Sequence, residues 1–186
     1  RGMRNPLGLK FDAQGRLWDL EHGPAGGDEL NLIEQGKNYG WPLVSFGDHY
    51  DGRKIPRPST RPDLALPAIS WNPVIAPGDF IFCRCAAFPN WRGQALIASL
   101  GAQGLVRVAI NGTKAREVER YNLDARIRSI AEREDGALFV LEDGEGGRLT
   151  EAVDRLSAAT LFVDETPALT PAEIRARARR MARQCG

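Results

Sequence analysis

The stretch Ile127–Leu141 reads IRSIAEREDGALFVL, in which two apolar runs flank a polar turn that contains Asp135-Gly136. Asp-Gly between two apolar runs is a strong signal for a β-hairpin. A further short run, Arg148–Ala152, follows after a few polar and glycine residues. The stretch therefore predicts a strand, a tight turn, a strand, a short loop and a strand.

The same order of elements occurs twice more, earlier in the chain. Short strands that recur at intervals of tens of residues favour a β-propeller, whose blades are four-stranded sheets around a channel, although an ordinary antiparallel sandwich remains an alternative. Three repeats are fewer than the four to eight blades of a closed ring, so we expect further blades upstream of Arg1. The two earlier copies are Gly8–Phe11, Leu17–Leu20 and Glu29–Ile33 with a turn at Asp12–Gly15, and Gly78–Phe82, Ala95–Ala98 and Leu105–Ile110 with a turn at Asn90–Gly93.

The composition is that of a globular protein: 186 residues, 42% hydrophobic and 26% charged. These values exclude a disordered tail, a collagen-like fibre and a disulfide-dense mini-protein. No apolar run approaches the ~18 residues that a membrane span needs. The formal net charge of +1 gives no overall attraction to nucleic acid.

Charge and turn content change near residue 154, which we interpret as a domain boundary. Residues 154–169 read as a linker, and residues 170–186 as an amphipathic α-helix. Thr170, Pro171 and Glu173 have the spacing of a helix-capping box. The predicted fold is therefore all-β, with about three blades of a partial propeller over residues 1–153 and one C-terminal α-helix.

Cys83 and Cys85 are two residues apart, so on a strand they would face the same side. Neighbouring cysteines of one strand rarely have disulfide geometry. We therefore expect two buried or half-buried thiols.

The densest polar cluster is the loop Glu21–Glu29, EHGPAGGDE. Its glycine-rich turn leaves backbone carbonyls free, and Asp28 and Glu29 add carboxylate oxygens. An oxygen-only set suits Ca²⁺, whereas zinc is disfavoured because His22 and His49 have no partner at ligand spacing. An acidic surface loop is the alternative reading. No Gly-Lys-Ser/Thr closes the run, so it is not a P-loop.

Two arginine-containing motifs open different repeats: Arg4-Asn5 precedes the first, and Arg126-x-Arg128 opens the third. In a propeller, the ends of the inner strands converge on the central axis. Arginines gathered there would suit a small polyanion that carries carboxylates. Each arginine taken alone also fits an ordinary surface charge.

A series of short motifs runs through residues 1–153. In order they are Arg4–Gly8, Glu21–Pro24, Gly27–Asn31, Gly36–Pro42, Trp71, Ile75–Pro77, Phe88–Gly93 and Arg126–Arg128. Together they resemble the soluble PQQ-dependent aldose sugar dehydrogenases of the glucose/sorbosone dehydrogenase family. The resemblance implies a six-bladed β-propeller of which this chain holds about the C-terminal half.

The resemblance also implies a bound pyrroloquinoline quinone (PQQ), a flat tricarboxylate, with a Ca²⁺ that polarises it. His22 would line the site, and Trp71 would flank the quinone ring or the sugar. Some members of the family place a Lys after a Ser-Leu or Ala-Leu pair near PQQ, whereas this chain has Ser99-Leu100-Gly101, so the resemblance does not extend to that contact. The residues expected to hold PQQ oxygens are Arg4, Asn5, Arg126 and Arg128.

Two calcium ions are implied by the same resemblance. Backbone carbonyls of Gly23 and Pro24 would ligate the PQQ-bound ion, with Asp28 behind them. Glu29 and Tyr39 would hold a second, structural ion.

The implied reaction is the oxidation of an aldose at C1 to the lactone, with electrons passed to PQQ and then to a cytochrome or quinone. The catalytic His of the family is expected upstream, so we expect no catalytic residue in this chain and no activity from it alone. The alternatives are a non-enzymatic propeller interaction module and a calcium-dependent lactonase-type hydrolase. The resemblance implies a periplasmic or secreted location.

The last residues, Met181–Gly186, resemble the entry to a cytochrome c haem motif, with Cys185 as its first cysteine. This would imply haem c in a fused downstream domain. An unrelated terminal helix is the alternative.

Overall fold

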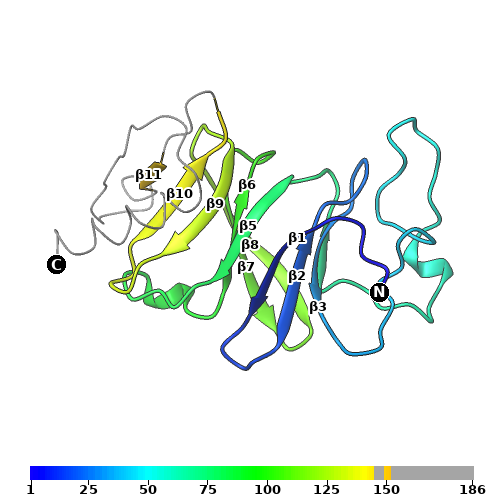
Figure 1. Cartoon of the computed structure of the whole chain (residues 1–186), viewed down its shortest axis with the longest axis horizontal. Helices are drawn as coiled ribbons and strands as arrows, with labels where there is room; N and C mark the ends of the chain where they lie inside the picture. Colours follow the sequence, from blue (N-terminus) through cyan, green and yellow to red (C-terminus); the bar gives the residue numbers. More distant parts are fainter. Residues whose placement is uncertain (145–148, 152–186) are drawn as a thin grey trace.

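The computed structural model describes residues 1–144 and 149–151, and these form three antiparallel β-sheets side by side (Figure 1). The predicted linker, the C-terminal helix and Cys185 lie outside the described residues. Within the described part, no helix is long and apolar enough to cross a membrane. The described structure is therefore all-β, as predicted.

Each sheet is a meander in which consecutive strands pair. The first two sheets have the four strands expected of a propeller blade. The position of the fourth strand was not predicted, whereas the other strands lie within a few residues of their expected places. Two short 3₁₀ turns, Pro58–Thr60 and Pro89–Trp91, lie in the connections. The first sheet contains β1 (Pro6–Phe11), β2 (Leu17–Glu21), β3 (Asp28–Leu32) and β4 (Ile69–Trp71); the second contains β5 (Pro77–Phe82), β6 (Ala95–Ser99), β7 (Gly104–Asn111) and β8 (Lys114–Asn122); the third contains β9 (Ile127–Glu132), β10 (Leu138–Glu142) and β11 (Leu149–Glu151).

The three sheets share one local structural feature at the start of their first strand. In each, the first two strands pair with a shift of register near that end. In each, the residue after the second strand donates its backbone N–H to the carbonyl of the residue before the first strand. These bonds join His22 to Asn5 at 3.1 Å, Leu100 to Ala76 at 2.8 Å and Asp143 to Arg126 at 2.7 Å. The sheets are therefore structural repeats, as blades of a propeller are.

The first strands of the blades lie next to one another: β1 packs against β5, and β5 against β9. The approach is close at Gly78, where a Cβ would overlap the carbonyl of Arg128. Equivalent parts of neighbouring first strands meet. The residues just before each first strand therefore lie on the same side of the three sheets. The Arg4-Asn5 and Arg126-x-Arg128 motifs, which lie before or at the start of β1 and β9, are therefore on the same side of the sheets.

Two hydrophobic layers hold the blades together. Trp18, Leu20 and Phe80 belong to the layer between the first and second blades. Leu96 and Ile130 belong to the layer between the second and third. Full burial of one such side chain contributes about 1.5–3 kcal/mol, so packing between blades is the main support for their arrangement.

Cys83 and Cys85 form a disulfide in the structure, so the expectation of two thiols is wrong. The strand β5 already ends at Phe82, and Cys85 has a φ of +52°. The chain therefore turns between the cysteines, and their Cα atoms are 5.0 Å apart. That separation lies well within the disulfide range, whereas alternate residues of a strand are about 6.6 Å apart, close to its upper limit.

Candidate functional site

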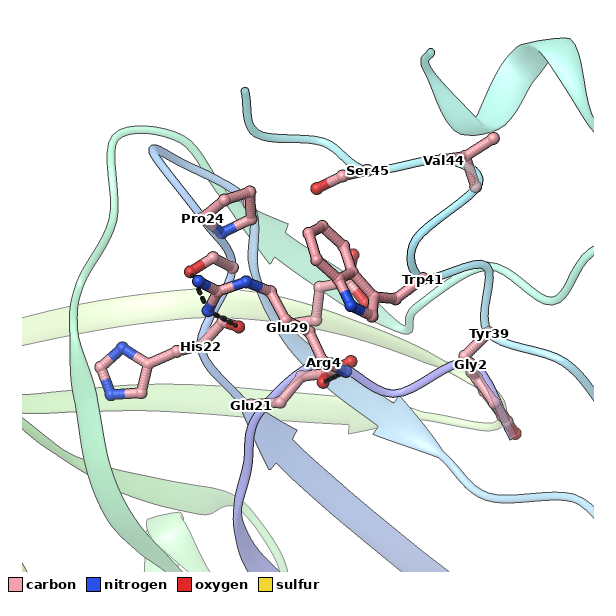
Figure 2. A pocket seen from close by; sticks show the side chains of 12 residues that line it. Gly2, Arg4, Glu21, His22, Pro24, Glu29, Tyr39, Trp41, Val44 and Ser45 are labelled. Carbon is pink, nitrogen blue, oxygen red and sulfur yellow. Dashed lines mark hydrogen bonds between the residues drawn. The ribbon is translucent and has the colours of Figure 1, made fainter. Parts of the chain in front are cut away.

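A small pocket opens at the mouth of the first blade (Figure 2). It is formed by the chain before β1, the loop between β2 and β3, and the segment after β3. Several sequence-predicted site residues therefore meet in one place. Its lining residues are Gly2, Arg4, Glu21, His22, Gly23, Pro24, Gly27, Glu29, Tyr39, Trp41, Val44 and Ser45.

Asp28 fixes the loop that forms the floor of this pocket. Its side chain is fully buried, and one carboxylate oxygen accepts the N–H of Gly23 at 2.9 Å. The other oxygen accepts the N–H groups of Ile75 at 2.9 Å and Ala76 at 2.8 Å. Burial raises the pKa of Asp28, and these N–H donors oppose that rise. Asp28 thus ties the loop to the start of the second blade.

The loop conformation depends on its glycines. A Cβ at Gly23 would overlap the carbonyl of Gly26. Gly26 and Gly27 have φ values of +96° and +74°, in the left-handed region that favours glycine. The tight turn leaves the carbonyl of Gly23 directed into the pocket, where a side chain reaches it.

That side chain is Arg4. Its Nη1 donates to the carbonyl oxygens of Gly23 at 2.8 Å and His22 at 3.1 Å (dashed in Figure 2). Its Nη2 donates to the Tyr50 hydroxyl at 3.2 Å. The guanidinium also lies 5.4 Å and 5.7 Å from the ring centres of Trp41 and Tyr50, within cation–π range. We had not predicted either aromatic residue, although Trp41 lies within the Gly36–Pro42 motif.

His22 and Asn5 flank this arginine. The His22 side chain is about one-quarter exposed, and its Nδ1 lies 4.0 Å from Asp28. The backbone of Asn5 is held by Glu21 and His22, while its side chain is exposed. Both side chains are therefore available to a ligand at the mouth.

A cluster of buried carboxylates lies beside the pocket on β2 and β3. Glu21 faces Glu29 across the two strands, and Asp19 faces Asn31. The Asn31 amide donates to Glu21 at 3.3 Å and to Glu29 at 3.4 Å. Neither carboxylate oxygen of Asp19 has a hydrogen-bond partner among the described residues. We refer to Asp19, Glu21, Glu29 and Asn31 as the carboxylate cluster.

Burial and mutual repulsion disfavour the charged forms in this cluster. Burial, with the nearby charge of Glu21, raises the pKa of Asp19 to about 7. Burial, with the charges of Glu21, Asp19 and Asp28, raises the pKa of Glu29 to about 8. Oxygen ligands of this kind are those that Ca²⁺ takes. The cluster can therefore hold either protons or a hard cation.

Tyr39 closes the pocket near this cluster. It is buried, its hydroxyl donates to the carbonyl of Leu32, and it accepts the N–H of Glu34 at 2.9 Å. The hydroxyl is thus engaged within the segment after β3. Glu29 and Tyr39 both line the pocket, which is the placement that a shared cation would require.

Arg126 and Arg128 lie at the mouth of the third blade and do not line this pocket. Nη2 of each lies 3.1 Å from Oδ2 of Asp143. The two arginines hold the pKa of Asp143 below its usual range. Asp143 occupies the blade position that His22 occupies in the first blade.

Trp71 does not line this pocket, and its expected contact with the quinone ring or the sugar stays a prediction. It is only 4% exposed and packs in the layer between the first two blades. Its indole Nε1 donates to Glu117 on β8 at 2.7 Å. Trp71 therefore packs the fourth strand of the first blade against the second blade.

Comparison with known proteins adds a family match over nearly all of this structure. A family model described as glucose/sorbosone dehydrogenase matches residues 1–151. An aldose sugar dehydrogenase of Escherichia coli K12 is 36% identical over 159 residues, which is 83% of this chain and 43% of that protein. Quinoprotein glucose dehydrogenase B of Acinetobacter calcoaceticus is 54% identical over 44 residues, 24% of this chain and 9% of that protein.

Solved structures give the same result. The apo form of the soluble aldose sugar dehydrogenase of Escherichia coli matches with a TM-score of 0.73 and 34% identity, over 88% of this chain and 46% of that one. A PQQ-bound aldose sugar dehydrogenase of Streptomyces coelicolor, at 23% identity and a TM-score of 0.52 over 88% of this chain and 44% of that one, shares the fold. The chain spans less than half the length of the curated relatives named here.

Proposed function

Since the chain belongs to the glucose/sorbosone dehydrogenase family, we propose that its pocket serves the PQQ- and Ca²⁺-dependent oxidation of an aldose at C1 to the lactone. The observation that carries this proposal is the meeting of Arg4 with the carbonyl of Gly23 in one pocket. PQQ, when bound, accepts the two electrons that the sugar loses. The residues described here would bind the cofactor and orient it.

The anionic side of the cofactor would be held by side chains from two blades. Arg4 and Asn5 precede β1, and Arg126 and Arg128 stand at the start of β9. A guanidinium binds a carboxylate through two parallel hydrogen bonds. Arginines at one mouth therefore fit a flat molecule with several carboxylates.

The cation of the cofactor would take the backbone carbonyls of Gly23 and Pro24 as ligands. Carbonyl oxygens suit Ca²⁺, and both residues line the pocket. Asp28 holds the Gly23 N–H and so positions the carbonyls without being a ligand itself. His22, at the rim, would line the cofactor.

A second Ca²⁺ would be held by Glu29 and Tyr39. The unpartnered oxygens of Asp19 support this proposal, because buried charges are costly unless they are paired. The carboxylate cluster supplies several oxygens around one place. This ion would stabilise the first blade and leave the redox chemistry to the pocket.

The remaining parts of the reaction are proposed to lie outside these residues. They are the general base that takes the proton of the sugar hydroxyl, a histidine in our proposal, and the acceptor, a cytochrome or quinone, that reoxidises the cofactor. We expect a periplasmic or secreted location. We favour oxidation over a lactonase-type hydrolase or an interaction module, because neither alternative requires arginines from two blades.

The test is dye reduction by the intact protein after it is stripped of metal and cofactor. Addition of PQQ and Ca²⁺ together, with an aldose, should restore reduction of the dye, whereas either alone should not. Arg4→Ala should impair reconstitution, while Arg53→Ala, which removes an exposed arginine that pairs with Asp51, should not. No sugar-dependent reduction under any of these conditions would contradict the proposal.

A further inference from the structure

One cation already occupies the floor of the pocket, and it belongs to the protein. The guanidinium of Arg4 donates through a single nitrogen to two carbonyl oxygens, those of Gly23 at 2.8 Å and His22 at 3.1 Å. In Figure 2 the arginine reaches over the loop from the opposite wall. The Gly23 oxygen is thus engaged by a positive charge.

This contact is fixed from several sides. Glu21 accepts the backbone N–H of Arg4 at 2.6 Å, which anchors the start of the side chain. Trp41 and Tyr50 lie against the guanidinium at its other end. Asp28 holds the N–H of Gly23, so the carbonyl that Arg4 contacts is also fixed. The arginine and its acceptor are both oriented before any ligand arrives.

A carbonyl oxygen that ligates Ca²⁺ cannot keep a guanidinium at hydrogen-bond distance without strong repulsion between the two cations. The repulsion is large because the pocket is partly desolvated. A metal ion that takes the Gly23 oxygen must therefore displace Arg4 from it.

We propose that Arg4 is a tethered cation that holds the carbonyl oxygen of Gly23 in the metal-free protein and gives it up when Ca²⁺ binds. The inference rests on the proposed function, since it takes the Gly23 carbonyl to be a ligand of the cofactor's metal. Its two parts are linked: the displaced guanidinium becomes free to bind a carboxylate of the cofactor. Arg4 thus couples loading of the cation to loading of the anion.

The exchange predicts that loss of the Arg4 charge changes the affinities for Ca²⁺ and for PQQ in opposite directions. Removing the charge of Arg4 removes a competitor of Ca²⁺, so Ca²⁺ should bind more tightly. The same change removes a carboxylate partner, so PQQ should bind more weakly. A residue that only supported the loop would weaken both ligands when it is replaced.

The experiment measures Ca²⁺ affinity by calorimetry in the absence of PQQ, with the metal-free intact protein. A Glu29→Gln background removes a ligand of the second proposed ion, so that the titration reports on the pocket. Ca²⁺ is taken into the millimolar range, because sites of few ligands are weak. Arg4→Gln should bind Ca²⁺ roughly tenfold more tightly than the parent, the factor that corresponds to loss of one charge-assisted contact.

Two further variants distinguish the direct contact of Arg4 with the Gly23 carbonyl from the electrostatic effect of net charge. Arg4→Lys keeps the charge and should stay near the parent affinity. Arg126→Gln removes an equal charge that pairs with Asp143 and has no contact with the loop, so it should change Ca²⁺ affinity by less than Arg4→Gln does. In each variant PQQ affinity in saturating Ca²⁺ is then measured by absorbance, and Arg4→Gln should weaken it.

The outcomes are distinct. If the parent binds Ca²⁺ and Arg4→Gln binds it equally tightly or more weakly, the proposed exchange is overturned, while the proposed function stands. Equal tightening by Arg126→Gln would also overturn it, because the effect would then be that of net charge. No Ca²⁺ binding by any variant, and no PQQ binding in its presence, would overturn the proposed function and the exchange with it.

Discussion

Glu21 on β2 and Glu29 on β3 lie directly opposite each other, and both carboxylates are buried. Like charges in such a cross-strand pair are destabilising. Asn31 bridges the pair through its amide, and Asp19 brings a third carboxylate whose oxygens have no partner among the described residues. Protons or a cation in this cluster therefore stabilise the first blade.

The first prediction concerns pH and the metal-free protein. The pKa of Glu29 is about 8 in the folded state, against 4.5 for the free side chain, so between these values the folded state binds more protons than the unfolded state. The free energy of unfolding should then fall as pH rises from about 5 to about 8, on the order of 3 kcal/mol in all. Urea unfolding at a series of pH values in EDTA measures it. Glu29→Gln should flatten the profile, and an unchanged slope in that variant would contradict the assignment.

A second prediction concerns removal of Ca²⁺ at pH 8, where the carboxylate cluster would otherwise be charged. Ca²⁺ at about 100 times its Kd stabilises the folded state by about 2.7 kcal/mol. EDTA should therefore lower the melting temperature of the intact protein. Asp19→Asn should reduce this effect, while Asp63→Asn, an exposed residue paired with Arg61, should leave it intact. A melting temperature that does not respond to chelation would count against the cation.

A third prediction concerns the joint between the first two blades. Asp28→Asn replaces one carboxylate oxygen by an amide nitrogen, which cannot accept the N–H groups now bound. Each buried donor left unsatisfied costs about 1–3 kcal/mol, so the variant should be less stable by at least about 1 kcal/mol. Urea unfolding with Asp63→Asn as the matched control measures the difference. Equal stability of the two variants would show that Asp28 does not carry this joint.

A fourth prediction concerns the mouth of the third blade. Arg128→Ala should weaken PQQ binding roughly tenfold, less than the full cost of a buried charged pair, because the Arg128 side chain is 44% exposed. Absorbance titration of the stripped intact protein with PQQ in Ca²⁺ gives the affinity. Arg120→Ala, which removes an arginine paired with Glu117 on β8, should bind PQQ as the parent does. A parent-like affinity in Arg128→Ala would place that side chain outside the site.

Much of the blade architecture follows from local signals in the sequence. The hairpins at Asp12–Gly15 and Asp135-Gly136 are set by turn chemistry, and the structure has both turns. The fourth strands were missed because β4 has only three residues and β8 is mostly charged. Such strands pair because the third strand of each blade offers an edge, which no periodicity in their own sequence reveals.

Two features of the site have no local signal in the sequence. Asp19 and Glu21 alternate with Trp18 and Leu20 along β2, a pattern that is typical of a strand with one solvent-facing side. The structure instead buries that side, with Tyr39 and its segment over it. For Trp71, an aromatic residue within a family motif can serve packing or ligand contact, and sequence does not distinguish the two, so its expected role stays a prediction.

The central claim is that one mouth binds a polycarboxylate quinone and Ca²⁺ together. The most direct measurement is an equilibrium titration of the stripped intact protein with PQQ, followed by absorbance, at saturating Ca²⁺ and again in EDTA. The account predicts stoichiometric binding with Ca²⁺ and at least roughly tenfold weaker binding without it, since the metal joins the Gly23 and Pro24 carbonyls to the ligand. Binding that is absent in Ca²⁺, or equally tight in EDTA, would contradict it.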